Sequence, residues 1–425
     1  MSSQKLRLPS KSPLLSPLVQ LAVAAVACVI WPFFLTARFL PAGIGDYVAQ
    51  NTLVACLAAL LLGFTVQRSL TSLPGTFESY GILPGYLTSF GLVLVVILLL
   101  RVEYTRSLLV MSFAACVIWF FVVYFMVQRR TLLRLGVIPG GRLPAFSALT
   151  GVTSRTLSLQ STLHDIDAVT ADFRHEHSDA WEARIADYTL SGIPVYHSKD
   201  LYESLTGRAE LESLSENNFG ALGPANSWML PKQVIDWLAA LVIGPLVLPI
   251  CLVAAVAIRL DGPGPILFRQ SRMGYRGKEF TVFKFRTMRV CTPSGDKGSV
   301  DDLITRPQDN RITRIGKFLR FTRIDELPQL INILRGEMSL IGPRPEATGL
   351  SDWYQSEVPF YRYRHIVKPG ITGWAQVNQG HVAGVDDIKM KLQFDFYYIR
   401  NFSIWLDILI VMKTIKTMLT GYGHK

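Results

Sequence analysis

Residues 238–258 read LAALVIGPLVLPICLVAAVAI, and the path of this stretch decides on which side of a membrane the residues after it lie. The stretch carries no charged side chain and is long enough to span a bilayer as a helix. Gly244, Pro245 and Pro249 lie in its middle, where proline removes a helix hydrogen bond and clashes with the preceding turn. The stretch therefore predicts either a kinked spanning helix or a re-entrant helix, residues 234–259, that breaks at Pro245 and Pro249 and returns.

Four charge-free stretches precede it, each of about twenty residues or more, the length of a spanning helix; they are 12–37, 47–67, 79–100 and 107–128. Half of the 425 residues are hydrophobic, so these runs predict four transmembrane helices within residues 12–128. Lys and Arg residues precede the first run and follow the fourth, which places both ends in the cytoplasm. Arg101 and Arg106 in the opposite loop are a mild objection.

Residues 131–222 alternate short strand patterns with turn or helix signals. The strand patterns are LRLGVIPGG, TLSLQ, DAVTADF and GIPVYH. They predict a small Rossmann-like α/β domain. Pro139 occupies the turn where a dinucleotide pyrophosphate would need backbone N–H groups, so no nucleotide cofactor is expected. Dimerisation, regulation by a nucleotide and docking of partner enzymes all stay open for this domain.

Positive charge is concentrated after the 238–258 stretch. The chain has a net charge of +11, and residues 259–323 hold fifteen Lys/Arg against six Asp/Glu, a local +9. A solvated basic face is one reading. Because the run directly follows a membrane segment, anionic lipid head groups and phosphorylated substrates suit it better than nucleic acid.

Residues 263–288 read PGPILFRQSRMGYRGKEFTVFKFRTM and predict a strand, a Gly-containing turn and a second strand. Phe283 and Phe285 alternate there with Lys284 and Arg286. Neighbouring side chains on one strand face are ~7 Å apart, which suits the two phosphates of a diphosphate. A solvated strand face is the alternative.

Residues 311–323, RITRIGKFLRFTR, space five cations three apart among apolar side chains. As a helix, the segment suits either the membrane interface or an amphipathic core position. Asp325 and Glu326 follow it. Asp is a common N-cap and Glu suits a first turn, so the dyad is read either as a helix start or as carboxylates that attack or hold a metal.

Two later loops offer groups for a phosphorylated substrate. Gly342–Glu346 reads GPRPE and holds Arg344, whose planar fork suits phosphate, between two prolines. Lys368–Asn378 reads KPGITGWAQVN and ends with Trp374, Gln376 and Asn378, side chains that fit either a base or sugar or an ordinary turn. Carboxylates, cations and a membrane together indicate Mg²⁺-assisted phosphoryl transfer beside a bilayer.

From Lys232 onward the chain resembles the bacterial sugar transferase family, the monotopic polyprenyl-phosphate phosphoglycosyl transferases. The resemblance lies in PGPILFRQSRMGYRGKEFTVFKFRTM, RITRIGKFLRFTRIDELPQLINILRGEMSLIGPRPE and VKPGITGWAQVN, in family order. The upstream regions resemble the large form of the family, such as undecaprenyl-phosphate glucose or galactose phosphotransferases.

The resemblance implies transfer of a hexose 1-phosphate from a UDP-sugar, expected to be UDP-glucose or UDP-galactose, to undecaprenyl phosphate. UMP is released with Mg²⁺ as cofactor, and the product initiates exopolysaccharide, capsule or O-antigen synthesis. Asp325 matches the nucleophile that takes the phosphosugar covalently, and Glu326 matches its partner acid; both are predicted to be catalytic and to bind the metal. Substrate or phosphate contacts are assigned to Lys284, Arg286, Arg320, Arg344 and Gln376.

Two details qualify the resemblance. Lys232 and Asp236 match a pair that precedes the re-entrant helix, but their spacing also permits a plain i,i+4 salt bridge. Many family members continue the last motif from its glutamine directly into a Gly-Arg pair, whereas this chain continues from Gln376 with Val377, Asn378, Gln379, Gly380 and His381. If that arginine contacts the phosphate or the sugar of the donor in those members, another residue must supply the contact in this chain.

The sequence thus predicts an α/β membrane protein of three regions: four transmembrane helices at 12–128, the Rossmann-like domain at 131–222 and a mixed α+β transferase domain at 232–425. The last is anchored by the re-entrant helix and interfacial amphipathic helices. We expect a homodimer in the bacterial inner membrane, with a cytoplasmic active site that contacts membrane lipids. A membrane-bound nucleotide- or lipid-diphosphate hydrolase and a non-catalytic assembly scaffold are the rival functions.

Overall fold

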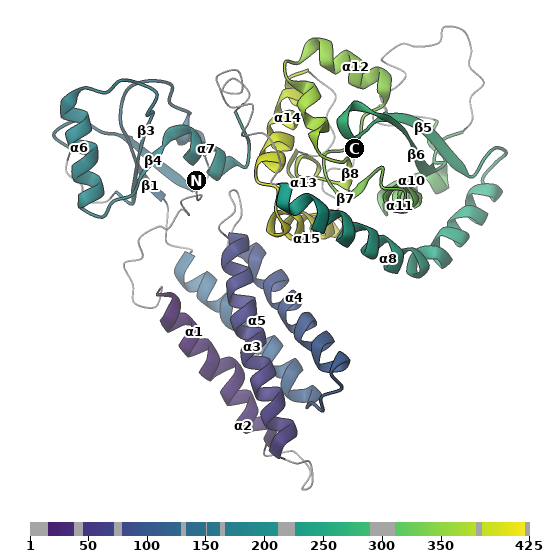
Figure 1. Ribbon diagram of the computed structural model, residues 1–425, viewed down its shortest axis with the longest axis horizontal. Coiled ribbons are helices and arrows are strands. Elements are labelled where there is room, and N and C mark those ends of the chain that lie inside the picture. The colour runs from purple at the N-terminus through teal and green to yellow at the C-terminus, as the bar shows by residue number, and fades with distance from the viewer. Residues whose placement is uncertain are drawn as a thin grey trace. The chain divides into compact units, whose positions relative to one another are not determined.

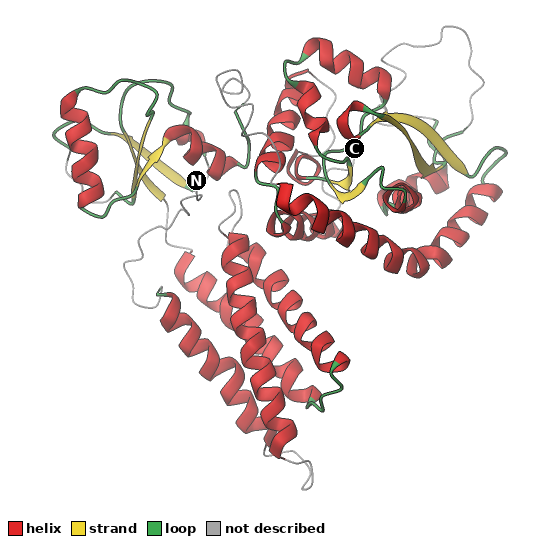
Figure 2. Cartoon of the chain, in the orientation of Figure 1, coloured by secondary structure: helices red, strands yellow, loops and turns green. Residues whose placement is uncertain are grey.

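The computed structural model describes residues 16–37, 46–71, 79–128, 133–149, 151–161, 166–210, 226–289, 311–379 and 385–420. It is rich in helices, with three small sheets (Figure 2). The chain divides into two compact units, Met1–Gly207 and Arg208–Lys425. Within the second unit, the N–H of Ala209 donates to the carbonyl of Gln393 at 3.0 Å, so residues just after Gly207 pack there.

Four long apolar helical segments follow the N-terminus, and each is long and apolar enough to cross a membrane. The first is continuous from α1 through a π-helical turn, η2, to α2; the others are α3, α4 and α5 (Figure 1). Their bounds are Pro17–Ala25, Val26–Ile30, Trp31–Ala37, Asp46–Thr71, Ser79–Leu99 and Arg106–Gln128. The protein is therefore a helix-rich membrane protein.

Small and aromatic residues pack these helices together. A Cβ at Gly63 in α3 would lie 2.6 Å from the ring of Tyr86 in α4, so only glycine permits this approach. Tyr86 in turn stacks on Phe120 of α5, with ring centroids 5.1 Å apart. Outward-facing side chains such as Leu87 and Val110 are exposed and apolar, as expected of a surface that lipid covers.

A four-stranded parallel sheet follows, in the order β2-β1-β3-β4. The strands are β1 (Leu133–Val137), β2 (Val152–Thr156), β3 (Ala168–Ala171) and β4 (Val195–His197). Helices α6 (Asp179–Leu190) and α7 (Ser198–Thr206) and a short 3₁₀ turn, η3 (Phe146–Ala148), accompany it. The sheet has a hydrophobic cluster on each face, as parallel sheets require. The expected α/β character is confirmed, but the second strand lies at 152–156 and not over TLSLQ, residues 156–160.

The second unit mixes helices with an antiparallel hairpin and a small parallel pair of strands (Figure 1). The hairpin is β5 (Leu267–Met273) and β6 (Glu279–Phe285), joined through η6 (Tyr275–Gly277), and it confirms the two predicted strands. The parallel pair is β7 (Ser339–Ile341) and β8 (Gly370–Thr372). The remaining elements are α8 (Asn226–Leu260), α10 (Arg314–Phe321), η7 (Ile324–Gln329), α11 (Leu330–Leu334), α12 (Thr348–Glu357), η8 (Tyr361–Ile366), α13 (Trp374–Gln379), α14 (Val385–Arg400) and α15 (Ile404–Thr420).

Helix α8 contains the stretch that opened the sequence analysis. It is one continuous helix of 35 residues, so Pro245 and Pro249 lie inside the helix and do not end it. Its ribbon bends along its length, which fits the kink that was one of the two expectations and is a common effect of proline inside a helix (Figure 1). Ala240, before the prolines, packs on Val282 and Leu330, whereas Ile258, after them, packs in a separate cluster with Phe285. Both halves of α8 thus rest on the same unit.

The basic helix and the carboxylate dyad also differ in detail from the expectation. Helix α10 starts at Arg314, capped by the Thr313 hydroxyl, and so covers only part of residues 311–323. Asp325 is not an N-cap: the 3₁₀ helix η7 follows Arg323, which adopts a left-handed backbone conformation with φ of 60°. This turn ends α10 and places Asp325 and Glu326 in the buried interior of the unit.

Candidate active site

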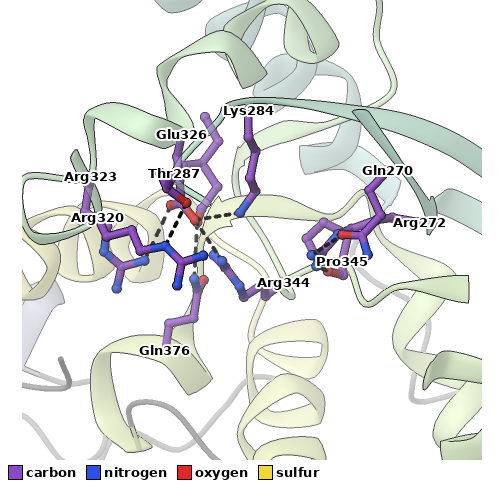
Figure 3. A network of polar contacts seen from close by, with 11 residues as sticks. Gln270, Arg272, Lys284, Thr287, Arg320, Arg323, Glu326, Arg344, Pro345 and Gln376 are labelled. Carbon is purple, nitrogen blue, oxygen red and sulfur yellow. Dashed lines mark hydrogen bonds and ion pairs between the residues drawn. The ribbon is translucent and has the colours of Figure 1, made fainter. Parts of the chain in front are cut away.

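Three segments of the chain bring three cations together around the carboxylate of Glu326 (Figure 3). Glu326 lies in η7, Lys284 in β6, Arg323 just before η7, and Arg344 in the loop after β7. The Lys284 ammonium lies 3.0 Å and the Arg344 guanidinium 2.7 Å from Glu326 Oε1, while Arg323 lies 3.4 Å from Oε2. Both oxygens of Glu326 are therefore bonded to cations.

This arrangement separates the acidities of the two neighbouring acids. Burial alone would raise the pKa of Glu326, but Arg344 and Lys284 outweigh it and hold that pKa well below its usual range. Burial raises the pKa of Asp325 to about 6, and the negative charge of Glu326 adds to the rise. A pair of adjacent acids with opposite pKa shifts is typical of catalytic sites.

Asp325 is the least satisfied group of this site. Its side chain is buried, and among the described residues Oδ1 has no hydrogen-bond partner. A buried polar atom without a partner is costly, so it needs an explanation. The electrostatic attraction of Lys284, Arg344 and Arg320 acts on Asp325 without forming a bond to Oδ1. Asp325 Oδ1 is therefore a carboxylate oxygen of this cluster to which no described protein group is bonded.

Arg320 and Gln376 lie at the edge of this cluster (Figure 3). The Nε of Arg320 donates to the hydroxyl of Thr287 at 2.8 Å, which fixes its guanidinium. Gln376, in α13, donates from Nε2 to the carbonyl of Ile371 at 3.3 Å, and its Oε1 is buried without a partner among the described residues. Both predicted residues therefore lie beside the Glu326 cluster (Figure 3).

Other predicted groups are used elsewhere. The Arg286 guanidinium donates to the carbonyls of Ile258, Gly262 and Pro263 at the end of α8, so the structure does not bring it to the cluster. Lys284 and Arg286 therefore do not jointly face a diphosphate.

Trp374 and Asn378 serve the fold rather than a base or sugar. Trp374 is fully buried against Tyr397 and beneath Lys413, so it cannot stack on a base. Asn378 donates to the Trp374 carbonyl and accepts from Lys413 at 2.6 Å. Of the three side chains at the end of KPGITGWAQVN, only Gln376 remains for a ligand.

The loop that carries Arg344 is held by residues that the sequence analysis missed. Arg364 donates to the Arg344 carbonyl at 2.9 Å and forms a buried ion pair with Asp395 at 2.8 Å. Arg272 donates to the next carbonyl, that of Pro345. Arg272 belongs to the first matching string, which could have indicated it, but no local pattern marks Arg364 in YRYRH or Asp395 in α14. These contacts fix the backbone from which the Arg344 side chain extends.

Lys232 and Asp236 lie apart from the cluster. The Lys232 ammonium lies 2.9 Å from Asp407 in α15 and 3.5 Å from Asp236, so the expected i,i+4 pair is present and is joined by a third residue. Asp236 also accepts from the hydroxyl of Ser339. The pair therefore fastens the first turns of α8 to β7 and α15.

The acids fit a Mg²⁺ ion only in part. Mg²⁺ in phosphoryl-transfer sites is usually held by one or two carboxylates together with substrate phosphates and water. Asp325 Oδ1 is free to serve in this way, whereas Glu326 would first have to release its cations. Within the described ranges no group of three or more His, Cys, Asp or Glu side chains could hold a metal without substrate.

Sequence comparisons with known proteins place this chain in a family. A relative from Aeromonas hydrophila, named UDP-N-acetylgalactosamine-undecaprenyl-phosphate N-acetylgalactosaminephosphotransferase, is 42% identical over 383 residues, which is 89% of each chain. A Caulobacter vibrioides UDP-glucose:undecaprenyl-phosphate glucose-1-phosphate transferase is 44% identical over 193 residues, 45% of this chain and 70% of the relative. The Escherichia coli protein of the same name is 42% identical over 190 residues, 44% and 39% of the two chains. The family profile described as "Bacterial sugar transferase" matches residues 227–421, and the chain belongs to the bacterial sugar transferase family.

Proposed function

We propose that this protein transfers a sugar 1-phosphate from a UDP-sugar to undecaprenyl phosphate, with Asp325 as the nucleophile. The observation that carries the proposal is Asp325 itself: a buried carboxylate with an unpartnered oxygen, surrounded by the cations Lys284, Arg344 and Arg320. Family membership supports it, because the relatives named above are sugar phosphotransferases that use undecaprenyl phosphate. The product would serve as the first unit of a surface polysaccharide.

In the proposed first step, Asp325 attacks the phosphorus that carries the sugar. A bond forms between the carboxylate oxygen and this phosphorus, and the bond to the bridging oxygen breaks, so that UMP leaves. Lys284 and Arg344 already point at one place, where they would stabilise the charge on the transferring phosphoryl group. A pKa of about 6 leaves Asp325 mostly ionised at neutral pH, as a nucleophile must be.

In the proposed second step, the phosphate of undecaprenyl phosphate attacks the same phosphorus. The bond from Asp325 to phosphorus breaks, and the carboxylate is restored. Mg²⁺, when bound, would neutralise charge on the donor diphosphate, and the Asp325 oxygen that does not attack phosphorus would be its protein ligand. Since Asp325 takes the phosphosugar before the lipid phosphate attacks, the proposal predicts ping-pong kinetics.

The donor sugar is proposed to be a UDP-linked hexose or N-acetylhexosamine. UDP-glucose or UDP-galactose is the expectation from the sequence. The relative that matches along 89% of the chain is named for UDP-N-acetylgalactosamine, whereas the Caulobacter and Escherichia coli relatives are named for UDP-glucose and match less than half of it. UDP-N-acetylgalactosamine is therefore the first donor to test.

We also propose that α8 enters the bilayer and returns, which keeps the site on the cytoplasmic face of the inner membrane. A straight helix of this length would be about 50 Å long and would exceed a hydrocarbon core of ~30 Å. Near its start Lys232 pairs with Asp407, and at its end the Ile258 carbonyl accepts from Arg286. Because both ends are bonded to one compact unit and the ribbon bends, a re-entrant path explains α8 better than a spanning one (Figure 1).

The test is UMP release by the full chain with Mg²⁺, measured for a panel of UDP-sugars with and without undecaprenyl phosphate. The proposal expects release that requires both the lipid and one donor sugar, and that is lost in Asp325→Asn. The matched control is Asp352→Asn, which removes an exposed carboxylate from α12 and should leave the rate unchanged. Sustained release without lipid would favour a hydrolase, and no release with any donor would favour an assembly scaffold.

A further inference from the structure

A cavity of about 300 Å³ lies at the start of α8, away from the Asp325 cluster. Its lining comes from the first turns of α8, from η6, from β7 and from the segment before β8. Asp325, Glu326, Lys284 and Arg344 do not contribute to it. The volume suits a small ligand or the head of a larger one.

The charged side chains that line this cavity have ion-pair partners among the described residues, except for one lysine. Lys232 and Asp236 line it, and both are buried and bonded to each other and to Asp407 or Ser339. Lys368 also lines it, is partly buried, and makes no hydrogen bond or ion pair with any described residue. Burial lowers the pKa of Lys368, and Asp236 only partly opposes that effect. An anion would therefore be attracted to Lys368.

A second donor lies beside that cation. A Cβ placed on Gly336 would lie 3.7 Å from the Lys368 Nζ and 4.0 Å from the Gln233 Nε2, so both nitrogen atoms lie close to one point. Gly336 itself has a positive φ of 74°, which favours glycine. Both residues line the cavity, so an ammonium and an amide are available there as two neighbouring donors, a set that suits the oxygen atoms of a phosphate group.

The rim of the cavity is apolar and continues into the exposed apolar face of α8. Leu230 is 72% exposed on the rim, and Val234 lies one turn further along the same face of α8 with 56% exposure. Val367 and Phe402 complete the apolar lining. A soluble anion would leave this rim uncovered, whereas a lipid would cover it with its chains.

We infer that this cavity binds the phosphate head group of an anionic bilayer phospholipid, with Lys368 and Gln233 on the phosphate and the acyl chains along Leu230 and Val234. The occupant is a bilayer lipid and not the acceptor of the reaction, because no residue of the Asp325 cluster lines the cavity. Bound there, the lipid holds the first turns of α8 at the depth of the head groups.

The test measures phospholipid retention by native mass spectrometry. The full chain is reconstituted in equimolar phosphatidylcholine and phosphatidylglycerol and then extracted into mild detergent. Wild type should retain one phosphatidylglycerol. Lys368→Met should retain it at least about tenfold less well, since it loses a charge-assisted contact, and Lys368→Arg should restore retention. Lys389→Met, which removes an exposed cation of α14, is the matched control and should behave as wild type.

A second variant keeps the test independent of folding defects. Gln233 is exposed, so Gln233→Leu should fold normally and still weaken retention. Equal retention by wild type and Lys368→Met, or equal retention of both phospholipids, would overturn the inference. Displacement by inorganic phosphate would identify a free-anion site, and displacement by an equal amount of undecaprenyl phosphate would identify an acceptor site; either result would also overturn it.

Discussion

Replacing Asp325 with asparagine should stabilise the protein while it abolishes transfer. The fold holds this carboxyl at a pKa of about 6 instead of 3.8, a difference that corresponds to roughly 3 kcal/mol. Since the pKa is higher in the folded than in the unfolded state, the carboxyl contributes full stability below pH 3.8, and this stability is lost as the pH rises through about 6. Asparagine cannot ionise, so it avoids that loss.

The expected gain in the free energy of unfolding at neutral pH is therefore at most roughly 3 kcal/mol. For a unit the size of residues 208–425, each kcal/mol raises the melting temperature by about 2–4 °C. Thermal unfolding of the purified full chain, compared with wild type at several pH values, measures the gain. The difference should disappear as the pH approaches 3.8, where wild-type Asp325 is itself mostly protonated.

The control is again Asp352→Asn, whose exposed side chain should give the same melting temperature as wild type at every pH. If Asp325→Asn were as stable as wild type at neutral pH, or less stable, the carboxylate would not be held in an unfavourable environment. The central premise of the proposed mechanism would then be wrong. A stability gain without loss of UMP release would instead exclude Asp325 as the nucleophile.

Three further predictions concern the groups around Asp325. The wild-type kcat/KM for UMP release should fall as the pH decreases below about 6, and Glu326→Gln should move this fall to lower pH, because the Glu326 charge helps to raise the Asp325 pKa; an unchanged profile would contradict the coupling. Glu326→Gln should also lower the free energy of unfolding by about 3–5 kcal/mol, measured by thermal melting, since it leaves buried cations without a counter-charge; a loss below about 1 kcal/mol would fit an exposed pair instead. Thr287→Val should reduce kcat/KM by about tenfold or more, because it removes the hydroxyl that accepts from Arg320. The matched control, Thr322→Val, should leave kcat/KM unchanged, because the Thr322 hydroxyl donates to carbonyls of α10.

The sequence predicts local features of this fold well. Charge-free runs identified the long apolar helices, and alternation identified the hairpin of β5 and β6. The dyad was recognised by its position after a basic segment and by family resemblance. Each of these signals is contained in a short window of the chain, so it can be recognised from the sequence alone.

Contacts between distant segments could not be predicted in this way. Arg286 follows Lys284 by two residues, yet β6 ends between them, and the guanidinium turns to the carbonyls at the end of α8. Trp374 looks like a stacking group in sequence, but packing against Tyr397 buries it. The pair of Arg364 and Asp395, 31 residues apart, depends on how η8 meets α14, which no local pattern encodes.

In the proposed mechanism, the placement of Glu326 explains why an acid is useful next to the nucleophile Asp325. Without it, Lys284 and Arg344 would have only Asp325 as a carboxylate partner, and a tightly paired Asp325 would be a poor nucleophile. Glu326 is bonded to both cations and so leaves Asp325 Oδ1 unbonded. When a diphosphate enters, its oxygen atoms can share the same two cations, whose donor groups are already oriented. On this proposal, Glu326 keeps the two cations in place and leaves Asp325 unpaired, and so able to attack phosphorus.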